Sequence, residues 1–336
     1  MGERSGAPKK THIPDEVEFR TKPQIALDLI DRAKANGIQL MAWTADGFYG
    51  QNSEFLNGLD ARDEGFVVEV PADVRVWMVK PEVLKNPPEN VVGRPNKYPR
   101  LRRSQRSPSE VRDLGRYSPA FRKQTPQRYR IKDTHRGSEV WEIRWATCWR
   151  QTHDTRIVSN QCTLIVARNV LTDEVKFFLS NRVPGRDGWT LRMILRVAFG
   201  RWPIEDCFRE AKKELGLDHF ECRGWHCIHR HLFLTILSQL FCARARQQLS
   251  PCEDVLSGEL LTTEQVRRAA SVVVSAMTFP PQVRRQLFQD EAARQAYYAH
   301  RNGVASKSHR KKRRQQLTQL GIDPDKIKSA DRQKPP

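Results

Sequence analysis

The first eighty residues alternate between two spacings of apolar side chains. Apolar positions recur at helical spacing over 23–36 and again over 53–61, whereas the short apolar runs at 38–45 and 66–70 have the length and composition of strands. Alternating helices and strands are typical of an α/β domain. Residues 1–80 are therefore predicted to contribute to an α/β core.

The middle of the chain departs from this pattern twice. Residues 81–136 are rich in Pro, Arg, Ser and Lys and contain few apolar residues, which predicts a basic linker or a segment that becomes ordered on a partner. Between residues 137 and 188, β-branched and aromatic runs are separated by polar turns. This second segment is predicted to form an inserted antiparallel β element.

Helical patterns fill the remainder of the sequence. Residues 189–250 are predicted to form a short helix, interrupted at Gly200, and two longer helices. The tetrapeptide Thr262-Thr263-Glu264-Gln265 has the form of a capping box at the start of a further helix. Residues 251–336 are predicted to be a helical basic tail.

The positive charge of the chain is concentrated in two segments. Lys and Arg number 58 against 39 Asp and Glu, which gives a net charge of +19. Residues 91–136 contribute +11 and residues 301–336 contribute +8, so the rest of the chain is balanced. Localised charge of this size favours a polyanionic partner, and DNA is the leading candidate. An RNA-associated protein would explain the charge equally well, but not the motif spacing described below.

The cysteines and the apolar stretches indicate the compartment. The seven cysteines form no CxxC pair, which favours a reduced compartment. Cys222 and Cys227 lie near three histidines, but their spacing is not that of a structural zinc site, so helix packing is the simpler interpretation. The first residues lack the apolar core of a signal peptide, and the stretch 232–241 is too short to span a bilayer. We expect a soluble cytoplasmic protein with no membrane partner.

Asp46 is the first candidate for chemistry. It stands at the carboxyl end of the predicted strand 38–45 and is followed by the turn Gly47-Phe48-Tyr49-Gly50. An acid at such a strand end is fixed in position yet open to ligands. The simpler alternative is a structural aspartate that accepts hydrogen bonds from the amides of the turn.

Glu205 is the second candidate, on the helix predicted over 203–215. It shares one helix face with Arg209 and Lys212. The adjacent face is apolar and is expected to meet a core: Ile204, Phe208, Ala211 and Leu215. The alternative is an ordinary ion pair of Glu205 with Arg209 on a solvated helix.

The spacing of this second segment resembles the glutamate signature of the bacterial insertion-sequence DDE transposases. The shared pattern is Arg201-x3-Glu205-x6-Lys212, followed by Glu214-Leu215-Gly216-Leu217-Asp218. Other segments are also similar to that family: Phe19-Arg20-Thr21-Lys22-Pro23 and Thr44-Ala45-Asp46-Gly47-Phe48-Tyr49-Gly50 around its second aspartate, and Cys222-Arg223-Gly224-Trp225-His226 through Arg230-His231-Leu232 after its glutamate. The similarity extends from Phe19 to about Gln248.

Two departures from the family pattern affect what the resemblance implies. The family has a tyrosine three residues before the arginine of the signature, where this chain has Ala198. The family's first catalytic aspartate lies on a central strand, whereas Asp15 is in a polar leader and Asp28 and Asp31 are on the first predicted helix. The resemblance thus implies an RNase H-like core, similar to that of retroviral integrases, that is incomplete at its amino-terminal side, as in a truncated transposase.

The resemblance also implies a chemistry and a set of partners. In the family, two divalent ions held by carboxylates activate the attacking oxygen and stabilise the leaving one. Asp46 and Glu205 would be the catalytic, metal-binding residues for Mg²⁺ or Mn²⁺, and Arg201 and Lys212 would contact DNA. Two carboxylates alone make an incomplete site, so the isolated chain is expected to be inactive unless an upstream fragment or an intact transposase contributes. The alternative is a non-catalytic DNA-binding remnant of a transposase.

Overall fold

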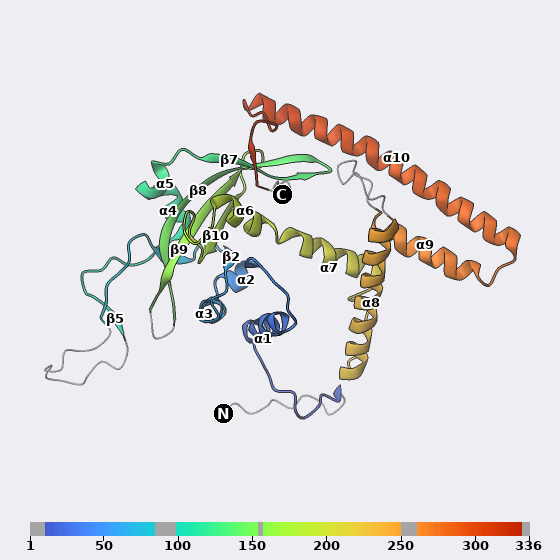
Figure 1. Ribbon diagram of the computed structural model, residues 1–336, viewed down its shortest axis with the longest axis horizontal. Helices are drawn as coiled ribbons and strands as arrows, with labels where there is room; N and C mark the ends of the chain where they lie inside the picture. The colour runs from blue at the N-terminus through green and yellow to red at the C-terminus, as the bar shows by residue number, and fades with distance from the viewer. Residues whose placement is uncertain (1–10, 85–98, 154–156, 250–260, 331–336) are drawn as a thin grey trace. The chain divides into compact units, whose positions relative to one another are not determined.

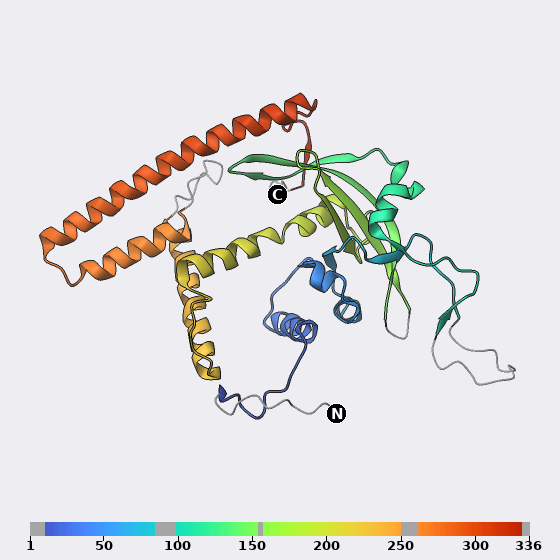
Figure 2. The same ribbon diagram turned by 180° about the vertical axis from the view of Figure 1, so that it is seen from behind.

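The structure is a computed structural model, and it describes residues 11–84, 99–153, 157–249 and 261–330. The chain divides into two compact units. We call Arg20–Arg201 together with Arg310–Pro336 the sheet unit, and Met1–Phe19 together with Trp202–His309 the helical unit. Each unit is described by itself (Figures 1 and 2).

The sheet unit contains every strand that the structure describes. In chain order the strands are β1 (Trp43–Ala45), β2 (Phe66–Val70), β3 (Arg75–Trp77), β4 (Val83–Leu84), β5 (Arg100–Leu101), β6 (Ser109–Glu110), β7 (Gln127–Thr134), β8 (Gly137–Gln151), β9 (Val158–Asn169), β10 (Val175–Ser180) and β11 (Lys328–Ser329). Its helices are α1 (Lys22–Ala35), α2 (Gly47–Gly50), α3 (Ser53–Ala61), α4 (Val111–Tyr117), α5 (Pro119–Arg122) and α6 (Leu191–Phe199).

Nine of these strands form one mixed sheet, which curls in Figure 1. Its main path runs β1-β2-β10-β9-β8-β3-β6, and β7 pairs with both β8 and β11. The pairs β1–β2 and β7–β11 are parallel, while the other pairs are antiparallel. The strand β1 is the last on its side of the path, so one of its edges has no strand partner among the described residues.

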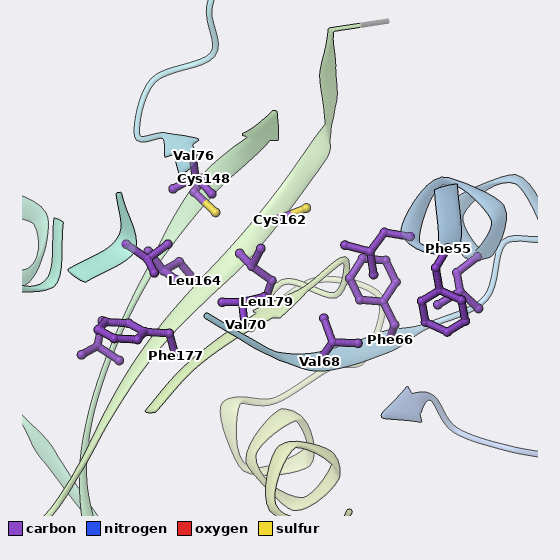
Figure 3. Packing of buried hydrophobic residues seen from close by; sticks show 14 of the residues in the cluster. Phe55, Phe66, Val68, Val70, Val76, Cys148, Cys162, Leu164, Phe177 and Leu179 are labelled. Carbon is purple, nitrogen blue, oxygen red and sulfur yellow. The ribbon is translucent and has the colours of Figure 1, made fainter. Parts of the chain in front are cut away.

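Successive residues of a strand point to opposite sides of the sheet. Apolar residues occupy both sides here, so the sheet has two apolar faces. Val68, Leu164 and Phe177 pack on one face, with residues of α1, α3, α4 and α5 (Figure 3). Val67 and Ile165 are buried on the other face, against α6. The result is a three-layer arrangement of helices, sheet and helix.

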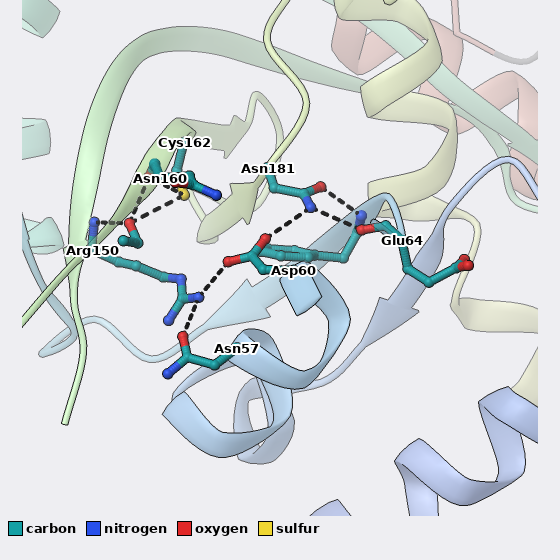
Figure 4. A network of polar contacts seen from close by, with 9 residues as sticks. Asn57, Asp60, Glu64, Arg150, Asn160, Cys162 and Asn181 are labelled. Carbon is teal, nitrogen blue, oxygen red and sulfur yellow. Dashed lines mark hydrogen bonds and ion pairs between the residues drawn. The ribbon is translucent and has the colours of Figure 1, made fainter. Parts of the chain in front are cut away.

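A buried polar network connects α3 to the long strand β8 (Figure 4). Arg150 on β8 donates from Nη2 to Asp60 Oδ2 at 2.7 Å and to Asn57 Oδ1 at 2.6 Å. Asn181 donates from Nδ2 to Asp60 Oδ1 at 3.1 Å, and its own Oδ1 accepts from Phe66 N at 2.9 Å. The network therefore joins segments of 57–66, 150 and 181, which lie far apart in sequence.

The helical unit buries few large apolar side chains among its described residues. It contains α7 (Trp202–Leu215), α8 (Trp225–Leu249), α9 (Thr263–Ala276) and the first part of α10 (Pro281–Gln319), whose residues from Arg310 onward belong to the sheet unit. The predicted capping box is confirmed: the Thr262 side chain accepts from Gln265 N, and the Gln265 side chain accepts from Thr262 N. Large apolar side chains of α8 remain exposed, including Phe233 at 61% and Phe241 at 57%.

Most of the predicted elements agree with the structure. The helix at 53–61 and the strand at 66–70 have the predicted bounds. The predicted strand 38–45 is shorter, because ladder pairing with β2 begins only at Trp43, whose N–H donates to Gly65 O. Residues 38–42 precede this contact, and Ile38 and Leu40 are about half exposed.

The central segments differ more from the predicted organisation. The segment 81–136, expected as a linker, contains α4, α5 and β7 among its described residues, because Val111, Phe121 and Tyr129 bury their side chains in the cores. The strands of 137–188, expected as an inserted β element, belong to the same sheet as β1 and β2, since β10 pairs with β2. No helix in the described ranges has the length and apolar character needed to cross a membrane.

Candidate active site

Asp46 directly follows β1 and caps α2, so it stands at the carboxyl end of a parallel strand. Its Oδ1 accepts hydrogen bonds from Phe48 N at 3.1 Å and from Tyr49 N at 3.4 Å, which makes it the N-cap of α2. The structural role that we considered for this residue is therefore real. The residue is exposed, and no described residue donates a hydrogen bond to Oδ2, so one carboxylate oxygen stays available for a cation.

The position of Asp46 depends on a close approach between α2 and β2. A Cβ atom on Gly50 would lie 1.9 Å from Glu69 O, so only glycine fits where α2 crosses the end of β2. Trp43 anchors the other end of this segment, since its indole Nε1 donates to Glu64 Oε2 at 2.8 Å. Lys34 Nζ lies 2.5 Å from the other Glu64 oxygen. The segment that carries Asp46 is thus fixed at both ends.

Glu69 is a second carboxylate at this edge. The parallel register pairs Ala45 with Val68, so Asp46 and Glu69 are the next residues along the two strands. Glu69 Oε1 is 3.3 Å from Lys176 Nζ, and Oε2 is 3.7 Å from Arg201 Nη2. Sequence reasoning missed Glu69, although a charged residue within the buried run Phe66–Val70 is an unusual feature that signals a role.

Lys22 contacts the turn that follows Asp46 and was not singled out from the sequence. Its Nζ is 5.5 Å from the centre of the Phe48 ring, and Phe48 is two residues after Asp46. A cation–π contact of this kind restrains the ammonium group beside the Phe48 ring. Lys22 could have been noticed in the sequence, because it belongs to the segment 19–23, which resembles the family's sequence around the second aspartate.

Arg201 and the helix that follows it carry the other predicted site residues. Arg201 belongs to the sheet unit, where its side chain is largely buried beside Glu69. Glu205 and Lys212 lie on α7 in the helical unit, and both are exposed. Asp46 and Glu205 therefore belong to different units, and their meeting at one metal ion stays a prediction.

The ion pairs and packing of α7 differ in part from the sequence-based expectation. Arg209 Nη2 pairs with Asp206 Oδ1 at 2.8 Å, whereas the sequence-based alternative paired Arg209 with Glu205. Of the apolar residues expected to meet a core, Ala211 is buried, but Ile204 and Phe208 are about half exposed.

The donor set bears directly on metal binding. Carboxylate oxygens suit Mg²⁺ and Mn²⁺, and Mg²⁺ commonly takes one or two protein carboxylates and completes its shell with water. Within the described residues, no group of three or more His, Cys, Asp or Glu side chains is arranged to hold a metal ion. The exposed Oδ2 of Asp46 fits one position of such a site, but not a complete one.

Comparison with known proteins adds one finding. Residues 4–138 match the family model described as DDE superfamily endonuclease. The matched range includes Asp46, Glu69 and Lys22, and it ends before Arg201 and Glu205. A comparison with curated proteins finds no match.

Proposed function

We propose that this chain, which is a DDE transposase-like protein by its amino-terminal part, takes part in phosphodiester cleavage and strand transfer at the ends of an insertion sequence. The observation that carries the proposal is the position of Asp46, at the carboxyl end of a parallel strand with one carboxylate oxygen available, inside the matched range. Open α/β sheets place ligands at this edge.

In this proposal Asp46 and Glu205 share a divalent ion, Mg²⁺ or Mn²⁺. The support comes from the connection along the chain. Arg201 pairs with Glu69, which follows Val68 as Asp46 follows Ala45 in the parallel register, and Glu205 is four residues after Arg201 in the sequence. When bound, the ion would activate an attacking oxygen and stabilise the leaving one.

Arg201 and Lys212 are proposed to contact the DNA backbone. Arg201 is held by Glu69, so its guanidinium is oriented before DNA binds. Lys212 is exposed on α7, so its ammonium group is accessible to a phosphate. Cationic contacts of this kind position DNA without reading its sequence.

The two carboxylates leave the site incomplete, so we propose that the isolated chain is inactive and that a further strand supplies a third acid. The free edge of β1 supports this. The Trp43 N–H faces β2, so the N–H and C=O of the next residue, Thr44, point toward the opposite edge, where no described strand pairs with them. An upstream fragment or an intact transposase would add the strand there.

Metal binding tests the shared site. We expect the purified chain to bind Mn²⁺ weakly, in a titration followed by electron paramagnetic resonance, and Asp46→Asn and Glu205→Gln each to weaken that binding about tenfold or more. The control Asp63→Asn removes a fully exposed acid and should change nothing. Equal Mn²⁺ affinity in all four proteins would contradict a site shared by Asp46 and Glu205.

A cleavage assay tests the proposed inactivity. We expect no Mg²⁺- or Mn²⁺-dependent nicking of a plasmid that carries the DNA flanking the gene. Strand cleavage by the isolated chain that is lost on Asp46→Asn would disprove the proposed inactivity while supporting the catalytic assignment.

A non-catalytic DNA-binding remnant is the second candidate, favoured by the absence of a three-ligand group among the described residues. Such a protein would bind DNA with equal affinity in EDTA and in Mg²⁺, and Glu205→Gln would leave that affinity unchanged. Loss of charge in the basic segments would instead weaken binding. The metal dependence of DNA binding therefore separates the two candidates.

A further inference from the structure

The two basic segments of the chain are used differently in the structure. In the segment 91–136, several described cations form ion pairs: Arg102 with Glu82, Arg112 with Glu110, Arg128 with Glu142, Arg130 with Asp133 and Asp325, and Lys132 with Glu139. Part of the positive charge in that segment is therefore paired with acids of the protein itself. The second segment contains the run Arg310–Arg314, all of which lies in the sheet unit.

This run is ordered by the sheet rather than trailing in solvent. It lies on the last part of α10, where Leu317 is buried with Val140 and Ile322. Arg313 Nη1 donates to Gly137 O at 3.3 Å, at the turn that joins β7 to β8. Gly137 has φ +104°, and a Cβ atom there would lie 3.3 Å from the Arg313 side chain, so glycine lets the turn approach the helix.

The contacts divide the five cations into two groups. Arg313 lies 3.9 Å from Glu139, and Arg314 pairs with Asp325 at 2.7 Å, so both are engaged with the sheet unit. Arg310, Lys311 and Lys312 are exposed and form no ion pair with a described residue. Because Arg310, Arg313 and Leu317 lie at helical spacing on the side that meets the sheet, Lys311 and Lys312 point away from it.

The turn between β7 and β8 adds a further cation beside the helix. Arg136 is exposed and directly precedes Gly137. A Cβ atom on Gly137 would lie 3.5 Å from the Cα atom of Arg310, so the turn and the helix are close together. We call the group Arg136, Arg310, Lys311 and Lys312 the hairpin–helix surface. Arg136 and Arg310 lie where the hairpin meets the helix, Lys311 and Lys312 lie on the outer side of the helix, and the Leu317 cluster holds the two elements together.

We propose that the hairpin–helix surface binds the backbone of double-stranded DNA, through residues other than those of the proposed metal site. The proposal rests on the proposed function, because it assumes DNA as the substrate. Adjacent cations on a fixed helix can each displace a counterion from a phosphate, which adds affinity without sequence preference. The surface would hold DNA flanking the reacting phosphate.

The salt dependence of DNA binding tests the proposal. We expect Lys311→Gln/Lys312→Gln to lower the slope of log affinity against log salt by nearly two for a duplex of about 30 base pairs, measured by fluorescence anisotropy in EDTA. The ratio of wild-type to variant affinity should then be about tenfold larger at 50 mM than at 200 mM salt. Both side chains are exposed, so the variant should fold, and its thermal midpoint checks this.

The matched control is Arg32→Gln/Lys80→Gln, which removes the same charge from exposed positions of the same unit that lie outside both basic segments. Equal effects of the two double variants would overturn the surface while leaving DNA binding intact. Failure of the wild-type chain to bind any duplex DNA would instead overturn the proposed function. An effect on an RNA duplex with none on DNA would also overturn the proposal.

Discussion

At the scale of single residues, local environment decides which groups are available for chemistry. Burial raises the pKa of the Cys148 and Cys162 thiols, so these two residues, which face each other across β8 and β9, behave as core side chains rather than as nucleophiles. Asp46 combines an N-cap role with an exposed oxygen. A capping role and a ligand role are thus compatible in one carboxylate.

Glu64 gives a pH dependence that can be measured. In the folded protein the bonded Lys34 ammonium and the Trp43 indole N–H lower the pKa of Glu64, although burial acts to raise it. Its stabilisation is therefore present above the unfolded pKa of about 4.3 and is lost as pH falls through the lower folded value. We expect Glu64→Gln to cost about 1 kcal/mol of unfolding free energy at pH 7, because Gln keeps the Trp43 bond but loses the charge.

The measurement is urea unfolding of both proteins between pH 3 and pH 7. The difference between wild type and Glu64→Gln should be constant above about pH 5.5 and should shrink toward zero in the acid range. The exposed Glu16→Gln is the control and should show no such difference. A difference that persists unchanged at pH 3 would assign the effect to packing rather than to the Lys34 pair.

At the scale of elements, the Arg150–Asp60 pair connects α3 to β8. Both side chains are almost fully buried, at 3% and 5% exposed, so removing one leaves an unpaired buried charge. We expect Asp60→Ala to destabilise the protein by about 3–5 kcal/mol. Arg150→Met with Asp60→Ala should cost less than the sum of the single variants, because the double variant buries no charge. Denaturant unfolding of all four proteins measures the coupling, and additive effects would contradict it.

Element bounds could be predicted largely from local signals. The capping box of Thr262 and Gln265 predicts the start of α9, and Gly200 predicts the end of α6. Caps and helix breakers can be recognised locally because they act over only a few residues. Strand partners could not be predicted in this way. The register of Val68 with Leu179 and the contact of Phe66 with Asn181 depend on chain segments far apart in sequence, for which local pattern carries no signal.

The candidate site shows the same limit. Asp46 and Arg201 were identifiable as candidates from the sequence because each stands in a local motif. Glu69 was not, because its place beside Asp46 follows from the parallel register of β1 with β2. The engagement of Arg313 with the β7–β8 turn was also beyond prediction, since a run of cations at 310–314 reads equally well as a solvated tail.

At the scale of the whole molecule, the two units differ in how much apolar surface they bury. Nearly all of the buried large apolar residues belong to the sheet unit, while α8 exposes Phe233, Leu234, Ile236 and Phe241. Local stability follows the density of buried contacts. We expect amide hydrogen exchange, followed by mass spectrometry, to be slow in β8 and β9 and at least a hundredfold faster in α8. Equal protection in α8 would show that this helix is covered in solution.

The strand order has a consequence for how the chain folds during synthesis. Phe66 at the start of β2 meets Asn181, 115 residues later, and β11 at 328–329 pairs with β7 at 129–130. Contacts of such long range slow folding, because loop closure precedes any gain from the pairing. The nascent amino-terminal strands would wait on the ribosome with their apolar faces uncovered, so production of this protein should depend strongly on chaperones and benefit from low temperature.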